Sequence, residues 1–117
     1  MKILITGCAG FIGSHLCHRL CQRGEDIIGI DNLNDYYDPK IKIANLKDLE
    51  IYPNFHFIKD DLVTTHILRQ HSFDCIVHLG AMAGVRNSLQ DPEIYIRTNV
   101  EGQTHLLNEA VKTNVRY

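Results

Sequence analysis

The sequence lacks the features that would place it among membrane, nucleic-acid-binding or metal-binding proteins. No apolar run approaches the about 18 residues that a membrane-spanning helix requires. Lysine and arginine are not clustered and the formal net charge is −2, whereas binding to nucleic acid needs grouped cations. The seven histidines show no ligand spacing, and there is no Cys-x-x-Cys pair. We therefore expect no membrane, nucleic-acid or metal partner.

The N-terminus and the cysteines are those of a cytoplasmic protein. The first residues, MKILITGCAGFIG, carry three glycines and no small-residue cleavage pattern of a secretion signal, and disulfides are not expected in that setting. Cys17 and Cys21 are four residues apart, on one side of a predicted helix. A metal site with a neighbouring histidine is one interpretation, but a buried stripe with Leu16 and Leu20 is favoured, because a free cysteine behaves as a small hydrophobe.

The composition is that of one globular domain in which apolar runs alternate with helical patterns. The chain has 117 residues, of which 44% are hydrophobic and 22% charged. Strands are predicted at residues 2–6, 26–30, 55–59 and 74–80, and helices at 11–23, 39–49, 61–71 and 91–114. Asp61 and Asp91 are expected at the starts of the last two helices, and residues 115–117 are expected to begin a fifth strand.

This alternation predicts an α/β fold, a doubly wound parallel sheet of Rossmann type, truncated after the fourth strand and the helix that follows it. The expected strand order is third, second, first, fourth. One stripe of the last helix is expected to pack on the sheet, and three further residues to lie on another side: the stripe is Ile96, Val100, Leu107 and Val111, and the other three are Tyr95, Gly102 and Leu106.

Three glycines at a strict interval of three residues mark the turn between the first strand and the first helix. Gly7 stands where the chain turns, Gly10 lets the backbone approach a pyrophosphate, and Gly13 lets the helix pack close to the strand. The helix N-terminus favours negative charge. Asp31 follows the second strand, where an acidic residue binds ribose hydroxyls and disfavours the 2′-phosphate of NADP. The motif and the acid together predict a dinucleotide site that prefers NAD. A thiol at Cys8, beside the helix N-terminus, is a candidate for a lowered pKa but not for catalysis.

The glycine spacing and several further segments resemble one family. These segments are TGCAGFIGSHL (6–16), DNLNDYYDP (31–39), DDL (60–62), HLGAMAGVRNSLQDP (78–92) and TNVEGQTHLLNEA (98–110). They resemble the extended short-chain dehydrogenase/reductase family, with its nucleotide-sugar epimerases and dehydratases, and the resemblance covers the whole chain. DNLNDYYDPKIK together with AGVRNSLQDP is most similar to the UDP-glucuronate 4-epimerase branch.

The resemblance implies NAD as the cofactor and a set of residues that contact it. Phe11 and Ile12 would line the pyrophosphate, and Asp61 would accept a hydrogen bond from the adenine amino group. The whole set is Gly7, Gly10, Phe11, Ile12, Gly13, Asp31, Asn32, Asn34, Asp61, Leu62, Leu79, Ala81, Ala83 and Asn99.

Two members of the resembling segments have a second interpretation. Asn99 either reaches the cofactor or is a core amide bonded to the backbone. Arg86 either meets a sugar carboxylate or diphosphate of the substrate, or forms a surface salt bridge. The chain departs from the pattern common among relatives at Asp60, Gly80 and Met82.

Members of this family catalyse their reactions with a Tyr-x-x-x-Lys pair and a Ser or Thr, which are placed after the fifth strand. We expect no such pair and no catalytic residue in this chain. Residues 1–117 would then be the N-terminal, NAD-binding part of a nucleotide-sugar epimerase, without the substrate domain. The implied reaction is 4-epimerisation of a UDP-sugar by transient oxidation at C4, and only a full-length form would bind the sugar nucleotide.

Two alternatives to the epimerase stay open, and one assembly is expected. If the chain is not part of an epimerase, it is either a non-catalytic dinucleotide-binding module or a fragment of a 4,6-dehydratase or decarboxylase. A homodimer is expected, through the last helix or through the unpaired edge of the fourth strand, since an exposed strand edge is a template for another chain.

Overall fold

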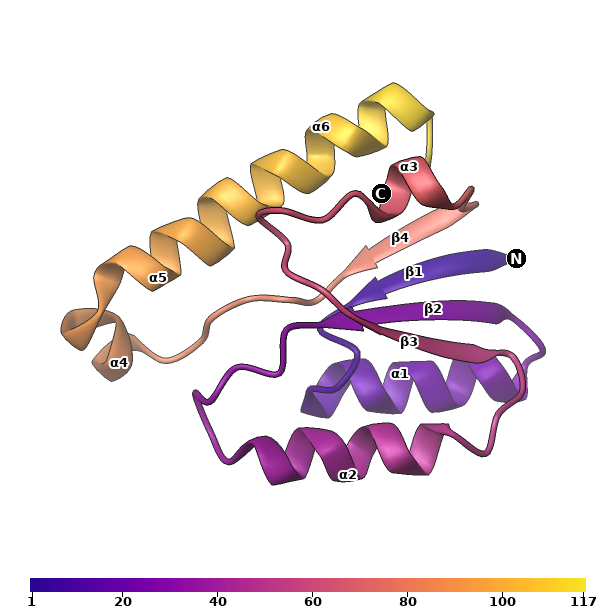
Figure 1. The fold of residues 1–117 in the computed structure, drawn as a ribbon, viewed down its shortest axis with the longest axis horizontal. Helices are drawn as coiled ribbons and strands as arrows, with labels where there is room; N and C mark the ends of the chain where they lie inside the picture. The colour runs from indigo at the N-terminus through magenta and orange to yellow at the C-terminus, as the bar shows by residue number, and fades with distance from the viewer.

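The four strands form one parallel sheet with helices on both faces (Figure 1). The computed structural model describes residues 1–117. The strands are β1 (Lys2–Thr6), β2 (Asp26–Asp31), β3 (Phe55–Lys59) and β4 (Cys75–His78), and all their pairings are parallel. Their order in the sheet is β3-β2-β1-β4, so the predicted fold class and strand order are confirmed.

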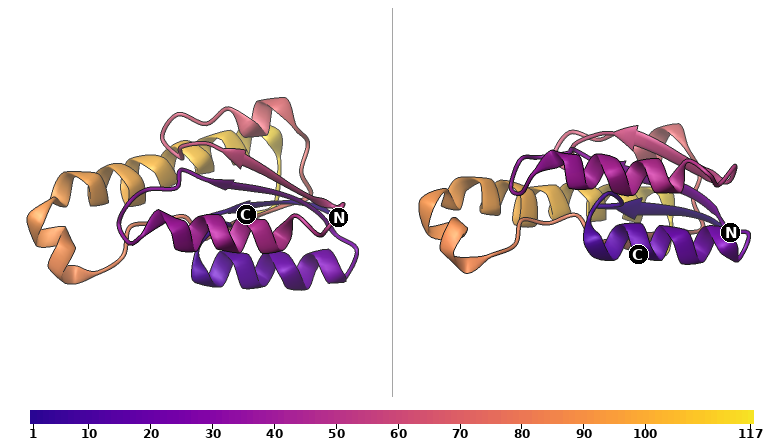
Figure 2. Two further views of the ribbon diagram at one scale, coloured as in Figure 1. Left: turned by 60° about the horizontal axis from the view of Figure 1, so that its bottom comes forward. Right: turned by 90° about the horizontal axis from the view of Figure 1, so that it is seen from below.

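The helices form a layer on each side of this sheet. α1 (Phe11–Gln22) and α2 (Pro39–Leu49) cover one face, and α3 (Ile67–Gln70) and α6 (Gln103–Thr113) lie on the other (Figure 2). α5 (Pro92–Ile96) and the π-helical turn η1 (Arg97–Gly102) continue in line with α6 past the ends of the strands. The short helix α4 (Val85–Gln90) precedes them. None of these helices combines the length and the apolar composition needed to span a bilayer.

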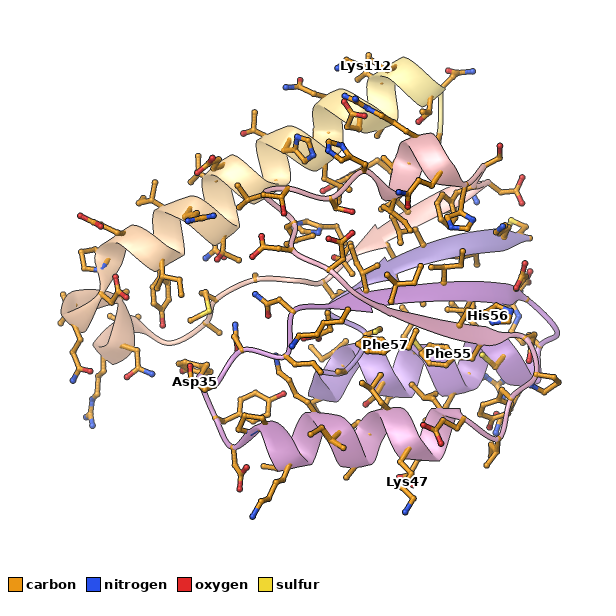
Figure 3. All side chains as sticks on the ribbon, viewed as in Figure 1. Asp35, Lys47, Phe55, His56, Phe57 and Lys112 are labelled. Carbon is orange, nitrogen blue, oxygen red and sulfur yellow. The ribbon has the colours of Figure 1, made fainter.

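Alternate side chains of each strand enter two separate cores, as the pleat of a strand requires. Ile3 and Ile5 of β1 face α1 and α2, whereas Leu4 faces α3 and α6. Cys17 and Cys21 of α1 belong to the first core, and Leu16 and Leu20 pack against it partly buried, which is the buried stripe favoured for this helix. No group of three or more His, Cys, Asp or Glu side chains is placed to bind a metal ion. Figure 3 shows Lys47 on the outer side of α2, pointing away from the sheet.

Two local predictions between β3 and α5 are wrong. No helix begins at Asp61: the chain makes a turn there, in which the Asp61 carbonyl accepts from the Thr65 N–H at 2.8 Å, and only Ile67–Gln70 is helical. The Asp61 carboxylate caps this turn instead of a helix, because it accepts from the Val63 N–H at 2.9 Å. The second concerns the segment between the strand predicted at 74–80 and the helix predicted at 91–114: the sequence pattern predicts no helix there, but residues 85–90 form α4.

The prediction of which residues of the last helix face the sheet is also wrong. Ile96 and Val111 are 62% and 80% exposed, whereas Leu106 is fully buried and Gly102 is buried. The reason is close packing: a Cβ on Gly102 would stand 3.0 Å from the Leu62 Cβ. The helix therefore packs inwards on the face of Gly102, Leu106 and Ala110, and the predicted stripe faces outwards. The start of a fifth strand is present as one parallel bridge, from Arg116 to Cys75 in β4.

A buried carboxylate fixes α6 to α3. Glu109 is 4% exposed and accepts two hydrogen bonds from the Arg69 guanidinium, at 2.6 and 2.9 Å, and one from Lys112 at 3.0 Å. These donors, with Arg69 the stronger, lower the pKa of Glu109 to about 2.

Glu109 is therefore expected to make folding stability depend on acid pH. Its pKa in the folded state lies below the ordinary 4.5, so its contribution is complete above that value and is lost as the pH falls towards 2. The difference in free energy of unfolding between the wild type and Glu109→Gln should be constant at about pH 5 to 7 and should shrink below about pH 4.5. Urea denaturation across this range measures it, and a difference that persists unchanged at about pH 3 would contradict the assignment.

Candidate functional site

A cavity of about 320 Å³ opens at the carboxyl ends of the strands, the edge at which open parallel sheets bind ligands. It is bordered by the turn after β1, the loop after β2, the turn after β3 and the loop after β4. Every predicted cofactor-binding residue except Asn99 lines it. The full lining is Gly7, Gly10, Phe11, Ile12, Gly13, Ile30, Asp31, Asn32, Asn34, Tyr36, Tyr37, Lys42, Asp60, Asp61, Leu62, Leu79, Gly80, Ala81, Met82, Ala83 and Thr98.

The glycine turn at the floor of this cavity has no room for side chains. Gly7 has a φ of +70°, and a Cβ there would stand 2.8 Å from the Gly80 N. A Cβ on Gly13 would stand 2.0 Å from the Gly7 carbonyl oxygen, a separation that no real structure tolerates. The predicted roles of Gly7 in the turn and of Gly13 in close packing are therefore confirmed by the geometry.

The N-terminus of α1 is suited to an anion. Its N-cap, Gly10, makes no side-chain cap, and the first turn carries no acidic residue, so the first N–H groups have no intrahelical acceptor and no competing negative charge. Phe11 and Ile12 are 76% and 67% exposed and form apolar walls beside these groups. Free N–H groups, a glycine cradle and a flat apolar rim fit the diphosphate of a dinucleotide.

The pKa of the Cys8 thiol is raised, whereas its place beside the helix N-terminus made it a candidate for a lowered pKa. The thiol is fully buried, and burial raises its pKa well above the ordinary value. Desolvation outweighs the helix N-terminus because the sulfur points into the core, where a Cβ on Gly29 would lie 2.7 Å from it. The thiol is therefore part of the hydrophobic core.

Asp31 is buried at the end of β2 and is held by three donors. Its Oδ2 accepts from the Ala9 N–H at 3.2 Å, and its Oδ1 accepts from the Leu33 N–H at 2.8 Å and from the Lys42 ammonium at 3.1 Å. Asn34 joins the cluster, since its Oδ1 accepts from Lys42 at 3.4 Å. The carboxylate predicted to bind ribose is thus one half of a buried ion pair.

Lys42 is the residue that sequence reasoning missed. Nothing in its local pattern distinguishes it from a surface lysine, but it lies one and two turns before Leu46 and Leu49, the buried residues of α2. Extending that spacing backwards would have placed Lys42 on the inner face. Tyr36 and Tyr37 were also missed; Tyr37 lies against Lys42, with the ammonium 5.5 Å from its ring centroid.

The loop after β4 is built on Thr6. Its Oγ1 accepts from the Leu79 N–H at 3.0 Å and the Gly80 N–H at 2.9 Å, and lies 2.7 Å from His78 Nδ1. Because two donors occupy the oxygen lone pairs, its own proton points to His78, whose Nδ1 must be unprotonated. Burial lowers the pKa of the His78 ring, in agreement with a neutral ring.

Asn99 serves the backbone of this loop. Its Oδ1 accepts from the Met82 N–H at 2.8 Å and its Nδ2 donates to the Met82 carbonyl at 2.9 Å. The second of its two interpretations, an amide bonded to backbone, is therefore the one observed; contact with a cofactor stays a prediction. Tyr95 strengthens the same loop by donating to the Ala83 carbonyl at 2.6 Å.

All three positions that depart from the family pattern line the cavity. The Met82 sulfur lies 3.2 Å from Asn34 Nδ2, which links the loops after β2 and β4. Asp60 accepts from the Thr65 hydroxyl. Arg86 lies in α4, is exposed and has no carboxylate within salt-bridge distance, so the surface salt bridge considered for it is not present.

The expectation that the chain has no Tyr-x-x-x-Lys spacing is wrong as a statement of sequence, because Tyr36 and Lys40 have it. The structure separates the two residues, however. Tyr36 lies in the loop after β2 and lines the cavity. Its hydroxyl lies so close to Gly84 that a Cβ on that glycine would be 2.3 Å from it. Lys40 follows Pro39 at the start of α2 and is not among the lining residues. The pair does not form one face of a helix.

Comparison with known proteins identifies relatives over nearly the whole chain. A family model described as GDP-mannose 4,6 dehydratase matches residues 4–117. UDP-glucuronate 4-epimerase 6 of Arabidopsis thaliana is 41% identical over 118 residues, which cover 97% of this chain and 25% of that protein.

Solved structures give the same result. UDP-glucuronic acid 4-epimerase of Bacillus cereus, a variant in complex with NAD and a fluorinated UDP-glucuronic acid, superposes with a TM-score of 0.92 at 35% identity, over 98% of this chain and 38% of that one. The dTDP-glucose 4,6-dehydratase DesIV of Streptomyces venezuelae, solved with NAD, has a TM-score of 0.84 at 31% identity, over 98% and 37%. The chain thus spans between 25% and 38% of the length of these relatives.

The contact of Gly13 with Gly7 can be tested by adding one methyl group. Gly13→Ala places a Cβ 2.0 Å from a backbone oxygen and is expected to lower the free energy of unfolding by about 2 kcal/mol or more. Gly10→Ala is the matched control, since its Cβ would lie 3.3 Å from the same oxygen; its cost should stay below about 1 kcal/mol. Equal losses in urea denaturation would show that close packing at Gly13 is not the constraint.

Proposed function

Because the chain belongs to the GDP-mannose 4,6-dehydratase family, we propose that residues 1–117 form the NAD-binding part of a nucleotide-sugar epimerase that inverts C4 of a UDP-sugar by transient oxidation. The observation that carries this proposal is the cavity where the glycine turn, the open N-terminus of α1 and Asp31 come together. The identity to UDP-glucuronate 4-epimerases, at 41% for the Arabidopsis relative, supports the epimerase branch.

Each part of NAD has a suitable wall. The diphosphate would lie on the N–H groups at the start of α1, between Phe11 and Ile12. The adenosine ribose would be bound by Asp31, with Asn32 and Asn34 beside it, and the adenine by Asp61 and Leu62. The nicotinamide half would lie along the loop of Leu79, Ala81 and Ala83, beside Asn99. When bound, NAD supplies the hydride acceptor of the transient oxidation.

Substrate binding and turnover are proposed only for a form that carries further residues. Arg86 is an exposed cation without a carboxylate partner, after the loop on the nicotinamide side, and is proposed to meet the sugar carboxylate or diphosphate. Tyr37 and Lys42 lie together at the cavity, but Lys42 is bonded to Asp31, on the side proposed for the adenosine ribose and not at the loop proposed for the nicotinamide. By themselves, residues 1–117 are expected to bind NAD without turnover.

A homodimer is the proposed assembly. The stripe of α5, η1 and α6 that was expected to face the sheet is turned outwards, with Ile96, Val100 and Val111 at 62%, 54% and 80% exposed. A row of apolar side chains along one helical surface is suited to packing against a second copy.

NAD binding at the α1 N-terminus can be tested by introducing a negative charge next to it. Ile12→Asp puts a carboxylate beside the proposed diphosphate. At about 5 Å and an effective dielectric near 20, two unit charges repel by about 3 kcal/mol before screening, so affinity for NAD should fall by at least about tenfold. Ile43→Asp makes the same charge change on a residue that is 54% exposed and outside the cavity, and should leave affinity unaltered. In calorimetric titrations, a wild type that does not bind NAD, or an Ile12→Asp variant that binds it equally well, would overturn the proposal.

The assembly has its own test. Val100→Glu/Val111→Glu is expected to convert a dimer of the 13.4 kDa chain into a monomer, as measured by light scattering at about 10 μM, a concentration at which exposed apolar surfaces associate. Ile51→Glu, at a residue 72% exposed just beyond α2, should leave the dimer intact. A monomeric wild type at this concentration would contradict the proposed assembly.

A further inference from the structure

The burial of Lys42 reverses the ordinary preference of a helix. Lys42 is 7% exposed, whereas its neighbours Ile41 and Ile43 are 53% and 54% exposed. Lysine is among the residues least often buried and isoleucine among those most often buried. Turning α2 so that an ammonium enters and two isoleucines face water costs free energy, so the cation must have a partner at the site.

That partner is the ribose carboxylate. The ammonium lies 3.1 Å from Asp31 Oδ1 and 3.4 Å from Asn34 Oδ1, and the side chains of Lys42 and Asp31 are 9% and 3% exposed. The pair changes the charge that the cavity presents to a ligand. Asp31 alone would present a full negative charge, but Asp31 paired with Lys42 presents nearly none. All three residues line the cavity.

Counting donors and acceptors shows what the pair has left for a ligand. Oδ1 of Asp31 accepts from the Leu33 N–H and from Lys42, which occupies both its lone pairs. Oδ2 accepts only from the Ala9 N–H and keeps one acceptor position. The ammonium has three protons and directs two of them to Asp31 and Asn34; the third has no oxygen or nitrogen acceptor in the chain, although the centroid of the Tyr37 ring lies 5.5 Å from the nitrogen. One acceptor and one donor thus remain, the complement of a ribose hydroxyl, which both donates and accepts.

We propose that Lys42 is a specificity-determining residue that opposes Asp31: it reduces the discrimination against NADP, and it becomes the 2′-phosphate donor when the Asp31 carboxylate is removed. This inference rests on the NAD site proposed above. The 2′-phosphate is repelled by Asp31 and attracted by Lys42, so the ratio of the two dissociation constants, NADP over NAD, depends on both charges. The uncharged 2′-hydroxyl of NAD is much less sensitive to either.

A double-mutant cycle on the full chain tests this, with calorimetric titration of NAD and NADP into the wild type, Lys42→Met, Asp31→Asn and the double variant. Lys42→Met should raise the NADP/NAD ratio by about tenfold, the size of one hydrogen bond to a charged group. Asp31→Asn should lower the ratio by at least as much. The double variant should bind NADP about tenfold more weakly than Asp31→Asn does.

The controls separate this role from a structural one. Lys42→Arg keeps the charge and should keep the wild-type ratio, and Lys42→Gln replaces the methionine variant if circular dichroism shows that the latter does not fold. A Lys42→Met or Lys42→Gln variant that weakens NAD and NADP equally would overturn the inference and leave the NAD site standing. A wild type that binds neither nucleotide would instead overturn the NAD site itself, and the inference with it.

Discussion

The approach of α1 to the glycine turn is the constraint on which the rest of the site depends. Because Gly13 has no side chain, the helix lies directly against the Gly7 carbonyl, where a Cβ would be 2.0 Å from the oxygen. This contact directs the first N–H groups of α1 to the edge of the sheet. The positive φ of Gly7 in turn brings the turn against Gly80, so that the loops after β1 and β4 share one wall. A single side chain at either glycine would separate the elements that enclose the cavity.

The polar residues around the cavity fall into two groups that the sequence does not distinguish. Thr6 and Asn99 form hydrogen bonds with the backbone of residues 79–82 and so stabilise the rim of the cavity. Asp31 and Lys42 keep one acceptor and one donor for a ligand. The second group is the one proposed to contact the adenosine ribose. The Asn99 amide, which the resemblance assigns to the cofactor, is bonded to both backbone groups of Met82.

Charge burial is concentrated in two ion pairs with different consequences. Glu109 is held by Arg69 and Lys112, whose own side chains are largely exposed, so that pair ties two helices together and responds to acid. Asp31 and Lys42 are both buried, and removing one partner of such a pair leaves an uncompensated charge. The second pair lies in the cavity, where a bound nucleotide can interact with either charge, and this links the packing of α2 to ligand selection.

The sequence by itself determined the strand order, the bounds of α2 and the position of the glycine turn, because these depend on local patterns: continuous apolar strands, Pro39 at a helix start, and glycines at a fixed interval. The predicted cofactor-binding residues, which rest on the glycine motif, on Asp31 and on the family resemblance, line the cavity except for Asn99, but the lining also includes residues that were not predicted, such as Tyr36, Tyr37 and Lys42. Only the tertiary structure decided which face of the last helix is buried. Both of its stripes have helical spacing, and close packing at Gly102 selected the less apolar one. The spacing of Leu46 and Leu49 puts Lys42 on the inner face of α2, but only the tertiary structure provides the partner that stabilises a buried cation there, because Asp31 is eleven residues away and on another element.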